Sequence, residues 1–176
     1  MNWLKKSSLS GNKLDKFRAL FVCTGNTCRS PMAEAILRKI LSDQGAQMVS
    51  TGSAGIAAVS GIPASFGAVS VLRKHGYDLM SHRSQPVTRR LMERSHLLLA
   101  MAADHYDYLI DAYPRHREKI HLLKKFGTDA DFDTEMLSIT DPIMGNWELY
   151  EKVFYDIYRE VKRISPLIVE MSRVDQ

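Results

Sequence analysis

Short apolar runs along the chain alternate with longer segments whose apolar residues recur at the spacing of a helix. Three of these runs are short enough for buried strands; they lie at 19–22, 96–101 and 119–123. The stretch MVSTGSAG, 48–55, is interpreted as a further strand followed by a loop. The remaining pattern predicts five helices, from Ser30-Pro31 to before Gly45, from Pro63 to His75-Gly76, over about 88–93, from Asp104 to about 112, and over 147–172. A long loop, 128–146, precedes the last helix.

Proline and polar residues indicate where several helices begin or end. Pro31 suits the first turn of a helix, where its missing N–H is not needed, and Pro63 predicts the start of the second helix in the same way. Asp104 can cap the fourth helix, and Pro114 prevents that helix from continuing. We expect the second helix to turn Phe66, Val69 and Leu72 inward, and the last helix to bury Trp147, Tyr150, Phe154, Ile157, Val161, Ile164, Ile168 and Met171.

The order of these elements predicts an α/β fold. Short strands that alternate with amphipathic helices form right-handed βαβ units and a parallel sheet. We therefore expect one small, doubly wound, four-stranded parallel sheet with helices on both faces, in a flavodoxin-like topology, as a single domain over residues 17–176. Residues 1–16 are polar and rich in lysine and serine, and are expected to be a flexible extension. In such sheets the ligand binds beyond the carboxyl ends of the strands, where the loop after the first strand lies.

Composition and charge exclude several classes of function. The 176 residues are 45% hydrophobic and 25% charged, as in globular proteins, and no apolar stretch approaches the ~20 residues of a membrane span. The N-terminus lacks the apolar region of a secretory signal, so we expect a cytoplasmic protein with no membrane partner. The net charge is +4, but the basic residues are scattered and match no nucleic-acid motif, so no nucleic-acid partner is expected.

No metal is expected either. The chain has two cysteines, and its six histidines are dispersed without the paired spacing of a zinc site. The acidic run Asp129, Asp131, Asp133, Glu135 begins like a calcium loop, but it lacks the glycine and the glutamate that such a loop requires at its sixth and twelfth positions. A solvated acidic stretch is the better interpretation.

Both cysteines lie in one short turn, VCTGNTCRSPMAEAIL, residues 22–37. Between a strand and a helix, the backbone N–H groups of residues 24–29 can point into one concavity, to which the helix N-terminus adds partial positive charge. Such a nest binds a tetrahedral dianion. Gly25 and Asn26 most readily take the positive φ angles that the loop requires. Arg29 can donate two hydrogen bonds to two phosphoryl oxygens.

The same turn can activate a nucleophile. Its positive field is expected to lower the pKa of Cys23 and to favour the thiolate, and Ser30 can donate a hydrogen bond to that sulfur. A buried cysteine is more often an inert small hydrophobe, and Ser-Pro is an ordinary helix start. The strand before the turn and the helix after it nevertheless favour a functional site.

The stretch VCTGNTCRSPMAEA resembles the active-site loop of the low-molecular-weight protein tyrosine phosphatase family, and the resemblance covers most of residues 18–172. The segments at 53–56 and 81–88 are also similar to segments of that family. The family implies a phosphorylated protein as substrate and a phosphocysteine intermediate on Cys23. It implies no cofactor, and we expect a monomer or a weak dimer.

The resemblance also assigns roles to the remaining site residues. It implies that the phosphoryl group is bound by Arg29 and by the loop made of Thr24, Gly25, Asn26, Thr27, Cys28 and Ser30. Asn26, Ser53 and His82 match positions that hold this loop in shape through hydrogen bonds. Cys28 matches a second cysteine that can form a reversible disulfide with the nucleophile, and so shields it from irreversible oxidation.

Asp141 is the candidate general acid. A positioned acid that protonates the leaving group accelerates such reactions typically ~10²–10⁴-fold. Spacing alone leaves open whether Asp141-Pro142 is merely a turn, but this dipeptide falls where the family keeps its acid.

The choice of substrate depends on Thr27. Tyrosine-specific members usually have isoleucine there and aromatic residues after the acid, whereas this chain has Ile143-Met144 after Asp141 and no aromatic residue at 56–61. The loop with threonine resembles the branch of the family that acts on phosphoarginine in proteins, which we favour. A tyrosine phosphatase of the same family, with or without dual activity, is the main alternative. An arsenate reductase-like enzyme, a phosphocarrier domain and a non-catalytic oxyanion-binding module are weaker alternatives.

Overall fold

The computed structural model describes residues 16–129 and 134–174. Its centre is a sheet of four parallel strands, β1 (Phe17–Cys23), β2 (Val49–Gly55), β3 (Leu97–Ala100) and β4 (Ile120–Leu122), in the order β2-β1-β3-β4. The register pairs Phe21 of β1 with Ser53 of β2 and with Leu99 of β3. The predicted four-stranded parallel sheet is confirmed.

The described residues also form five α-helices. They are α1 (Arg29–Asp43), α2 (Phe66–Lys74), α3 (Arg89–Arg94), α4 (Ala103–Ala112) and α5 (Trp147–Val174). Short 3-10 helices at Pro114–Lys119 and Thr134–Leu137 complete the described secondary structure. Helix α4 ends just before Pro114, as expected from the missing N–H of proline.

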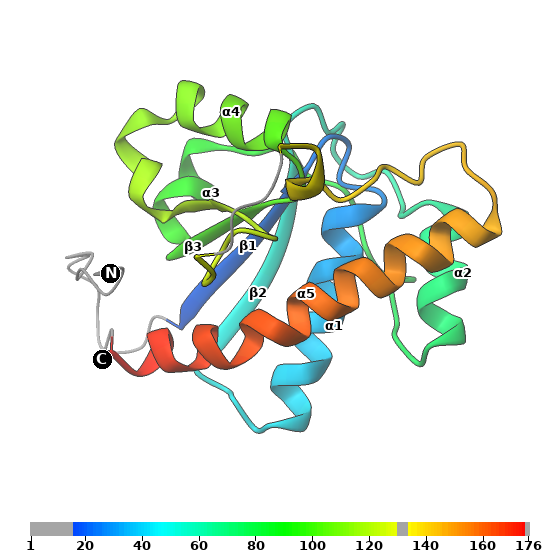
Figure 1. Cartoon of the computed structure of the whole chain (residues 1–176), viewed down its shortest axis with the longest axis horizontal. Helices are drawn as coiled ribbons and strands as arrows, with labels where there is room; N and C mark the ends of the chain where they lie inside the picture. Colours follow the sequence, from blue (N-terminus) through cyan, green and yellow to red (C-terminus); the bar gives the residue numbers. More distant parts are fainter. Residues whose placement is uncertain (1–15, 130–133, 175–176) are drawn as a thin grey trace.

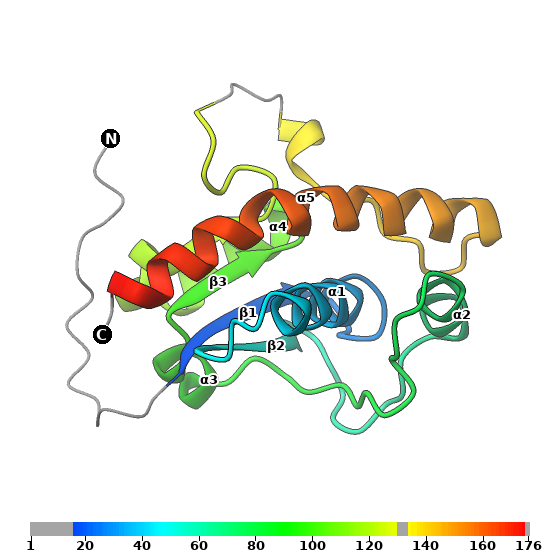
Figure 2. The ribbon, with the colours of Figure 1, turned by 90° about the horizontal axis from the view of Figure 1, so that it is seen from below.

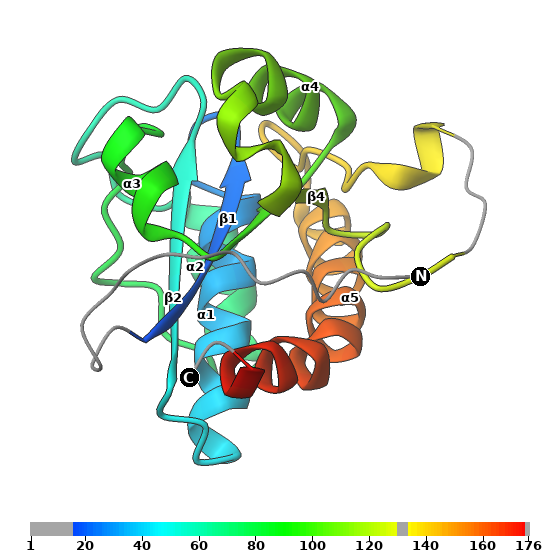
Figure 3. The same cartoon turned by 90° about the vertical axis from the view of Figure 1, so that its left-hand side faces the viewer.

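The helices lie on both faces of the sheet, and β1 contributes to both (Figures 1 and 3). Phe21 packs in the larger apolar cluster, which includes residues of α1 and α5. Leu20 and Val22 point to the other face, in a smaller cluster with Met92 of α3 and Leu109 of α4. Alternate residues of β1 are therefore buried on opposite faces, which places this strand and the loop after it in the middle of the fold.

Helix α2 departs from the predicted start. It begins at Phe66, because the Ser65 side chain accepts a hydrogen bond from the Ala68 N–H and caps the helix. Pro63 lies before the helix and forms an isolated bridge with Arg83. Phe66 is 87% exposed, so its predicted inward position is wrong, whereas Leu72 is buried as expected. Helix α2 lies beside the first half of α5, away from the sheet (Figure 2).

Two further expectations about the helices differ from the structure in detail. Ala102, not Asp104, is the residue that precedes α4, and Asp104 lies in the first turn of the helix without capping it. Trp147 is 40% exposed at the start of α5, although Tyr150 and most of the other expected residues of that helix are buried.

The predicted flexible extension falls almost entirely on residues 1–15, which lie outside the described residues, as do Asp131 and Asp133 of the acidic run. Within the described ranges, no helix has both the length and the apolar character needed to cross a bilayer.

Candidate active site

The loop 24–28 joins β1 to α1 at the carboxyl edge of the sheet, where α4 and the segment before α5 also meet (Figure 1). Asn26 takes a positive φ of 56°, as predicted, whereas Gly25 does not, so that part of the expectation is wrong. Among the described residues, no backbone carbonyl accepts a hydrogen bond from the N–H groups of 24–28. Apart from the Asn26 N–H, which acts on the Cys23 sulfur, these donors are therefore available to an anion.

Asn26 is fully buried and holds the loop through both ends of its amide. Its Nδ2 donates to the Ser30 Oγ at 3.0 Å and to the Ser53 Oγ at 2.9 Å, and its Oδ1 accepts from the Gln85 N–H at 2.9 Å. The His82 Nε2 lies 2.8 Å from the Asn26 carbonyl oxygen. The structure thus brings together Asn26, Ser53 and His82, which the resemblance linked, and adds Gln85.

The end of β2 fixes the loop from the side. The Ile56 N–H donates to the Cys23 carbonyl at 2.9 Å, and the Ala57 N–H donates to the Thr24 carbonyl at 3.0 Å. A Cβ at Gly55 would lie 2.4 Å from the Thr24 carbonyl oxygen, so no larger residue fits there without displacing the loop. Gly55 therefore allows the close approach of the two backbones.

The Cys23 sulfur lies at the base of this loop, and its side chain is only 2% exposed. The Ser30 Oγ is 2.9 Å away, and the backbone N–H groups of Asn26 and Ser30 also point to the sulfur. Burial raises the pKa of the Cys23 thiol, while the Ser30 and Asn26 hydrogen bonds and the Arg29 charge act in the opposite direction. Burial prevails, so the predicted lowering of this pKa is wrong for the loop as it stands.

Arg29 is buried beside the loop and brings Asp141 to the site. Its Nη2 forms an ion pair with the Asp141 carboxylate across 112 positions of sequence, and it also donates to the Thr24 Oγ1 at 3.3 Å. Its Nη1 donates to the Ile139 carbonyl at 3.2 Å. The guanidinium is therefore held from two sides, and the candidate acid contacts the candidate phosphate-binding residue directly.

Cys28 faces away from this centre, toward α2 and α5. Its Sγ donates to the Ser65 Oγ at 3.0 Å and lies 3.7 Å from the Tyr150 hydroxyl. Both cysteines are reduced in the structure, and the redox role of Cys28 remains a prediction. Ser65 and Tyr150 were not predicted for this site, because nothing near them in sequence indicates that they contact the loop.

His105 of α4 is a further residue that the sequence did not indicate. Its side chain is fully buried, and its Nε2 lies 2.8 Å from the Thr24 Oγ1. Burial and the Arg29 charge lower the pKa of His105 to about 4, against the opposing effects of Asp104 and Asp141. The ring is therefore neutral near pH 7.

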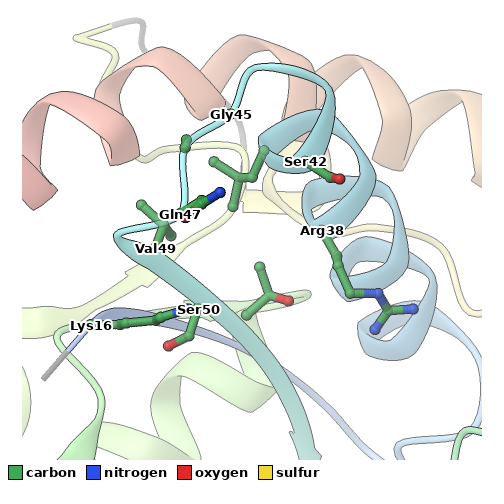
Figure 4. A pocket seen from close by; sticks show the side chains of 10 residues that line it. Lys16, Arg38, Ser42, Gly45, Gln47, Val49 and Ser50 are labelled. Atoms are coloured by element: carbon green, nitrogen blue, oxygen red, sulfur yellow. The ribbon is translucent and has the colours of Figure 1, made fainter.

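A separate cavity of about 430 Å³ lies at the opposite end of the sheet (Figure 4). Its lining includes Lys16, Arg38, Ser42 and Ser50, from the start of β1, helix α1 and the start of β2. None of the predicted site residues lines it. This cavity is therefore not part of the site around Cys23.

Comparisons with known proteins match most of the chain to one family. The family model described as low molecular weight phosphotyrosine protein phosphatase matches residues 18–173. A protein-arginine-phosphatase of Bacillus subtilis is 38% identical over 134 residues, 76% of this chain and 84% of that protein.

Solved structures of both substrate classes are also similar. The low molecular weight protein tyrosine phosphatase from T. tengcongensis is 36% identical, with 85% of this chain and 97% of that chain covered and a TM-score of 0.76. A mutant of the YwlE arginine phosphatase with a phosphorylated active-site serine is 31% identical, with 90% and 99% covered and a TM-score of 0.81.

Proposed function

The chain belongs to the low molecular weight phosphotyrosine protein phosphatase family, and we propose that it hydrolyses phosphoarginine in proteins through a phosphocysteine on Cys23. The observation that carries the choice of nucleophile is the convergence of donors on one sulfur. The Ser30 Oγ lies 2.9 Å from the Cys23 Sγ, and hydrogen bonds from Ser30 and from the backbone N–H of Asn26 act to lower the pKa of this thiol. Such donors stabilise the thiolate that attacks phosphorus and that later leaves again.

In the first step the Cys23 sulfur forms a bond to phosphorus as the P–N bond to the guanidino group breaks. The electron pair of the P–N bond goes to nitrogen, which takes a proton from Asp141, so that arginine leaves. The N–H groups of the loop and the Arg29 guanidinium bind the phosphoryl oxygens and stabilise the charge of the transition state.

In the second step water attacks phosphorus and the S–P bond breaks. Asp141, now ionised, takes a proton from the water, and the electron pair of the S–P bond returns to the Cys23 sulfur, where Ser30 donates to it. Together the two steps convert phosphoarginine and water into arginine and phosphate.

Asp141 has to exchange partners during this cycle. In the structure its carboxylate pairs with Nη2 of Arg29. A phosphoryl group that takes up this guanidinium replaces the carboxylate as its partner, and this leaves Asp141 beside the leaving group. Asp141 is 39% exposed on a loop, which allows that adjustment.

The preference for phosphoarginine rests on the residues around the loop. Thr27 is half-buried, and its carbonyl accepts a hydrogen bond from the Ser65 N–H at 2.9 Å, which fixes its backbone. Beyond Asp141, Ile143 is 53% exposed and Met144 is 98% exposed, so aliphatic rather than aromatic side chains follow the acid. A phosphotyrosine ring would find no stacking partner in them.

Phosphotyrosine hydrolysis is the second candidate. It is favoured by the likeness to the tyrosine phosphatase of T. tengcongensis, which is about as similar to this chain as the arginine phosphatase of B. subtilis. Identity alone therefore does not select the substrate. A cytoplasmic location and a monomeric or weakly dimeric state remain predictions.

We expect Thr27→Ile and Thr27→Val to lower the ratio of kcat/KM on phosphoarginine peptides to kcat/KM on phosphotyrosine peptides about tenfold, because both remove the hydroxyl that selects the guanidino group. Thr27→Ser keeps the hydroxyl and serves as the matched control, with the ratio unchanged. The assay compares peptides of one sequence that differ only in the phosphorylated residue.

An unchanged ratio in both Thr27→Ile and Thr27→Val would exclude Thr27 as the selecting residue. A wild-type protein that hydrolyses only the phosphotyrosine peptide would establish the second candidate instead.

A further inference from the structure

Within the described residues, the His105 side chain makes one hydrogen bond, and its partner belongs to the site. The ring lies on α4 with no exposed surface, and its Nε2 is 2.8 Å from the Thr24 Oγ1. Its Nδ1 is buried and has no hydrogen-bond partner within the described part of the chain. A buried imidazole requires a hydrogen-bond partner, and within the described residues the partner of His105 is a threonine of the catalytic loop.

Thr24 connects this histidine to Arg29. Its Oγ1 accepts a hydrogen bond from the Arg29 Nη2 at 3.3 Å, and the same nitrogen pairs with Asp141. The three side chains come from α4, the loop after β1, and α1, so they form a continuous chain of contacts across three elements. Thr24 itself is exposed, which places its hydroxyl at the surface of the site.

The charged groups that face His105 are Arg29 of α1, Asp104 of α4 and Asp141 of the segment before α5. The Asp104 carboxylate is 3.8 Å from Nε2, but it is largely exposed. Burial and the nearby guanidinium keep the ring neutral, with a pKa of about 4.

A neutral imidazole carries one N–H, and its position decides what Thr24 can do. A proton on Nδ1 would be a buried donor without an acceptor, which folded proteins rarely tolerate. A proton on Nε2 is donated to the Thr24 Oγ1 instead. Thr24 then accepts from both His105 and Arg29, and its own hydroxyl proton remains free to donate outward into the site.

We propose that His105 is a positioning residue, which holds the Thr24 hydroxyl beside the Arg29 guanidinium so that both donate to the same phosphoryl group. This inference rests on the proposed function, because it assigns a role within that site. It adds a phosphate donor, the Thr24 side chain, to the backbone N–H groups and Arg29, and it names the buried residue that orients this donor.

The test is a double-mutant cycle with His105→Phe and Thr24→Val. His105→Phe keeps an aromatic ring but removes the hydrogen bond, and Thr24→Val keeps the shape but removes the hydroxyl. The readouts are kcat/KM on para-nitrophenyl phosphate, the inhibition constant of inorganic phosphate, and the melting temperature. We expect each single variant to lower kcat/KM and weaken phosphate inhibition about tenfold. The double variant is expected to match a single variant, because both changes remove the same interaction.

Two conservative variants serve as controls. His105→Gln places an amide N–H near the position of Nε2 and is expected to restore most of the phosphate inhibition. Thr24→Ser keeps the hydroxyl and is expected to retain more of the phosphate inhibition than Thr24→Val. If the role of His105 were merely structural, His105→Phe would change the melting temperature. Thr24→Val would then still weaken phosphate inhibition in the His105→Phe background.

The proposal would be overturned if the two substitutions acted independently, so that kcat/KM of the double variant fell about a hundredfold. An unchanged phosphate inhibition constant in Thr24→Val, whose exposed position makes it informative even where His105→Phe does not fold, would also overturn it. A wild-type protein that turned over no phosphate ester would instead refute the proposed function, and the positioning role with it.

Discussion

The sulfur of Cys23 is subject to two opposing influences, its burial and the polar groups of its loop. Burial favours the neutral thiol and raises its pKa, whereas the hydrogen bonds from Ser30 and Asn26 and the charge of Arg29 favour the thiolate. Replacement of water by fixed donors is what allows a buried sulfur to be charged at all. Single donors around this atom therefore affect its reactivity directly.

Ser30→Ala is expected to raise the pKa of Cys23 further, because it removes the hydroxyl that stabilises the thiolate. The sign follows from linkage: with the thiolate less stable, a higher pH is needed to reach the same ionised fraction. The measurement is the pH dependence of iodoacetamide alkylation in a Cys28→Ala background, where Cys23 is the only thiol.

Ser65→Ala is the control for this shift, because Ser65 lies on the other side of the loop, next to position 28, which is alanine in this background. We expect the midpoint of alkylation to move to higher pH in Ser30→Ala and to stay in place in Ser65→Ala. A midpoint that fell in Ser30→Ala would show that the hydroxyl stabilises the thiol instead.

The site residues that could be predicted lie in one continuous stretch or match a family segment. Cys23, Asn26 and Arg29 lie within seven consecutive residues, so their chemical roles could be predicted from the sequence before the fold was known. His105 and Tyr150 are 81 and 122 positions from their loop partners. Only the packing of α4 and α5 against the sheet brings them to the site, and no local pattern encodes that approach.

At the scale of elements, β1 and β3 were predictable because each is a short, largely buried apolar run between turns, whereas β2 (VSTGSAG) carries three polar residues and was predicted from its place between two helices. The start of α2 could not be predicted, because Pro63 and Ser65 are both typical of a helix start. In the structure Ser65 caps the helix, which therefore begins at Phe66. Helix α2 also depends on tertiary contact: a Cβ at Gly67 would lie 2.5 Å from carbons of the Tyr150 ring. The close packing of α2 and α5 therefore requires a glycine there.

Gly67→Ala is expected to destabilise the protein by about 1–3 kcal/mol, because the added methyl group displaces the Tyr150 ring or separates the two helices. The measurement is the free energy of unfolding in urea. Arg73→Ala on the exposed side of α2 is the matched control, expected to stay within about 0.5 kcal/mol of the wild type. Equal stability of the two variants would show that α2 adapts without strain.

At the scale of the whole molecule, the parallel sheet gathers the chemistry at one edge. The carboxyl ends of β1 and β3 direct the Cys23 loop and α4 toward the same side, and the segment before α5 brings Asp141 there (Figure 1). The cavity at the other end of the sheet is lined by residues from the starts of β1 and β2 and from α1 (Figure 4). The fold class could be predicted from the order of the elements, and the position of the site followed from it.

Mass spectrometry of protein quenched with denaturant during hydrolysis of a phosphoarginine peptide shows whether Cys23 carries the phosphoryl group during turnover. We expect one added phosphoryl group, located by fragmentation on Cys23 in the wild type, and neither this adduct nor turnover in Cys23→Ala. A wild type without the adduct on Cys23, or a Cys23→Ala variant that still hydrolyses the peptide, would contradict this role of Cys23.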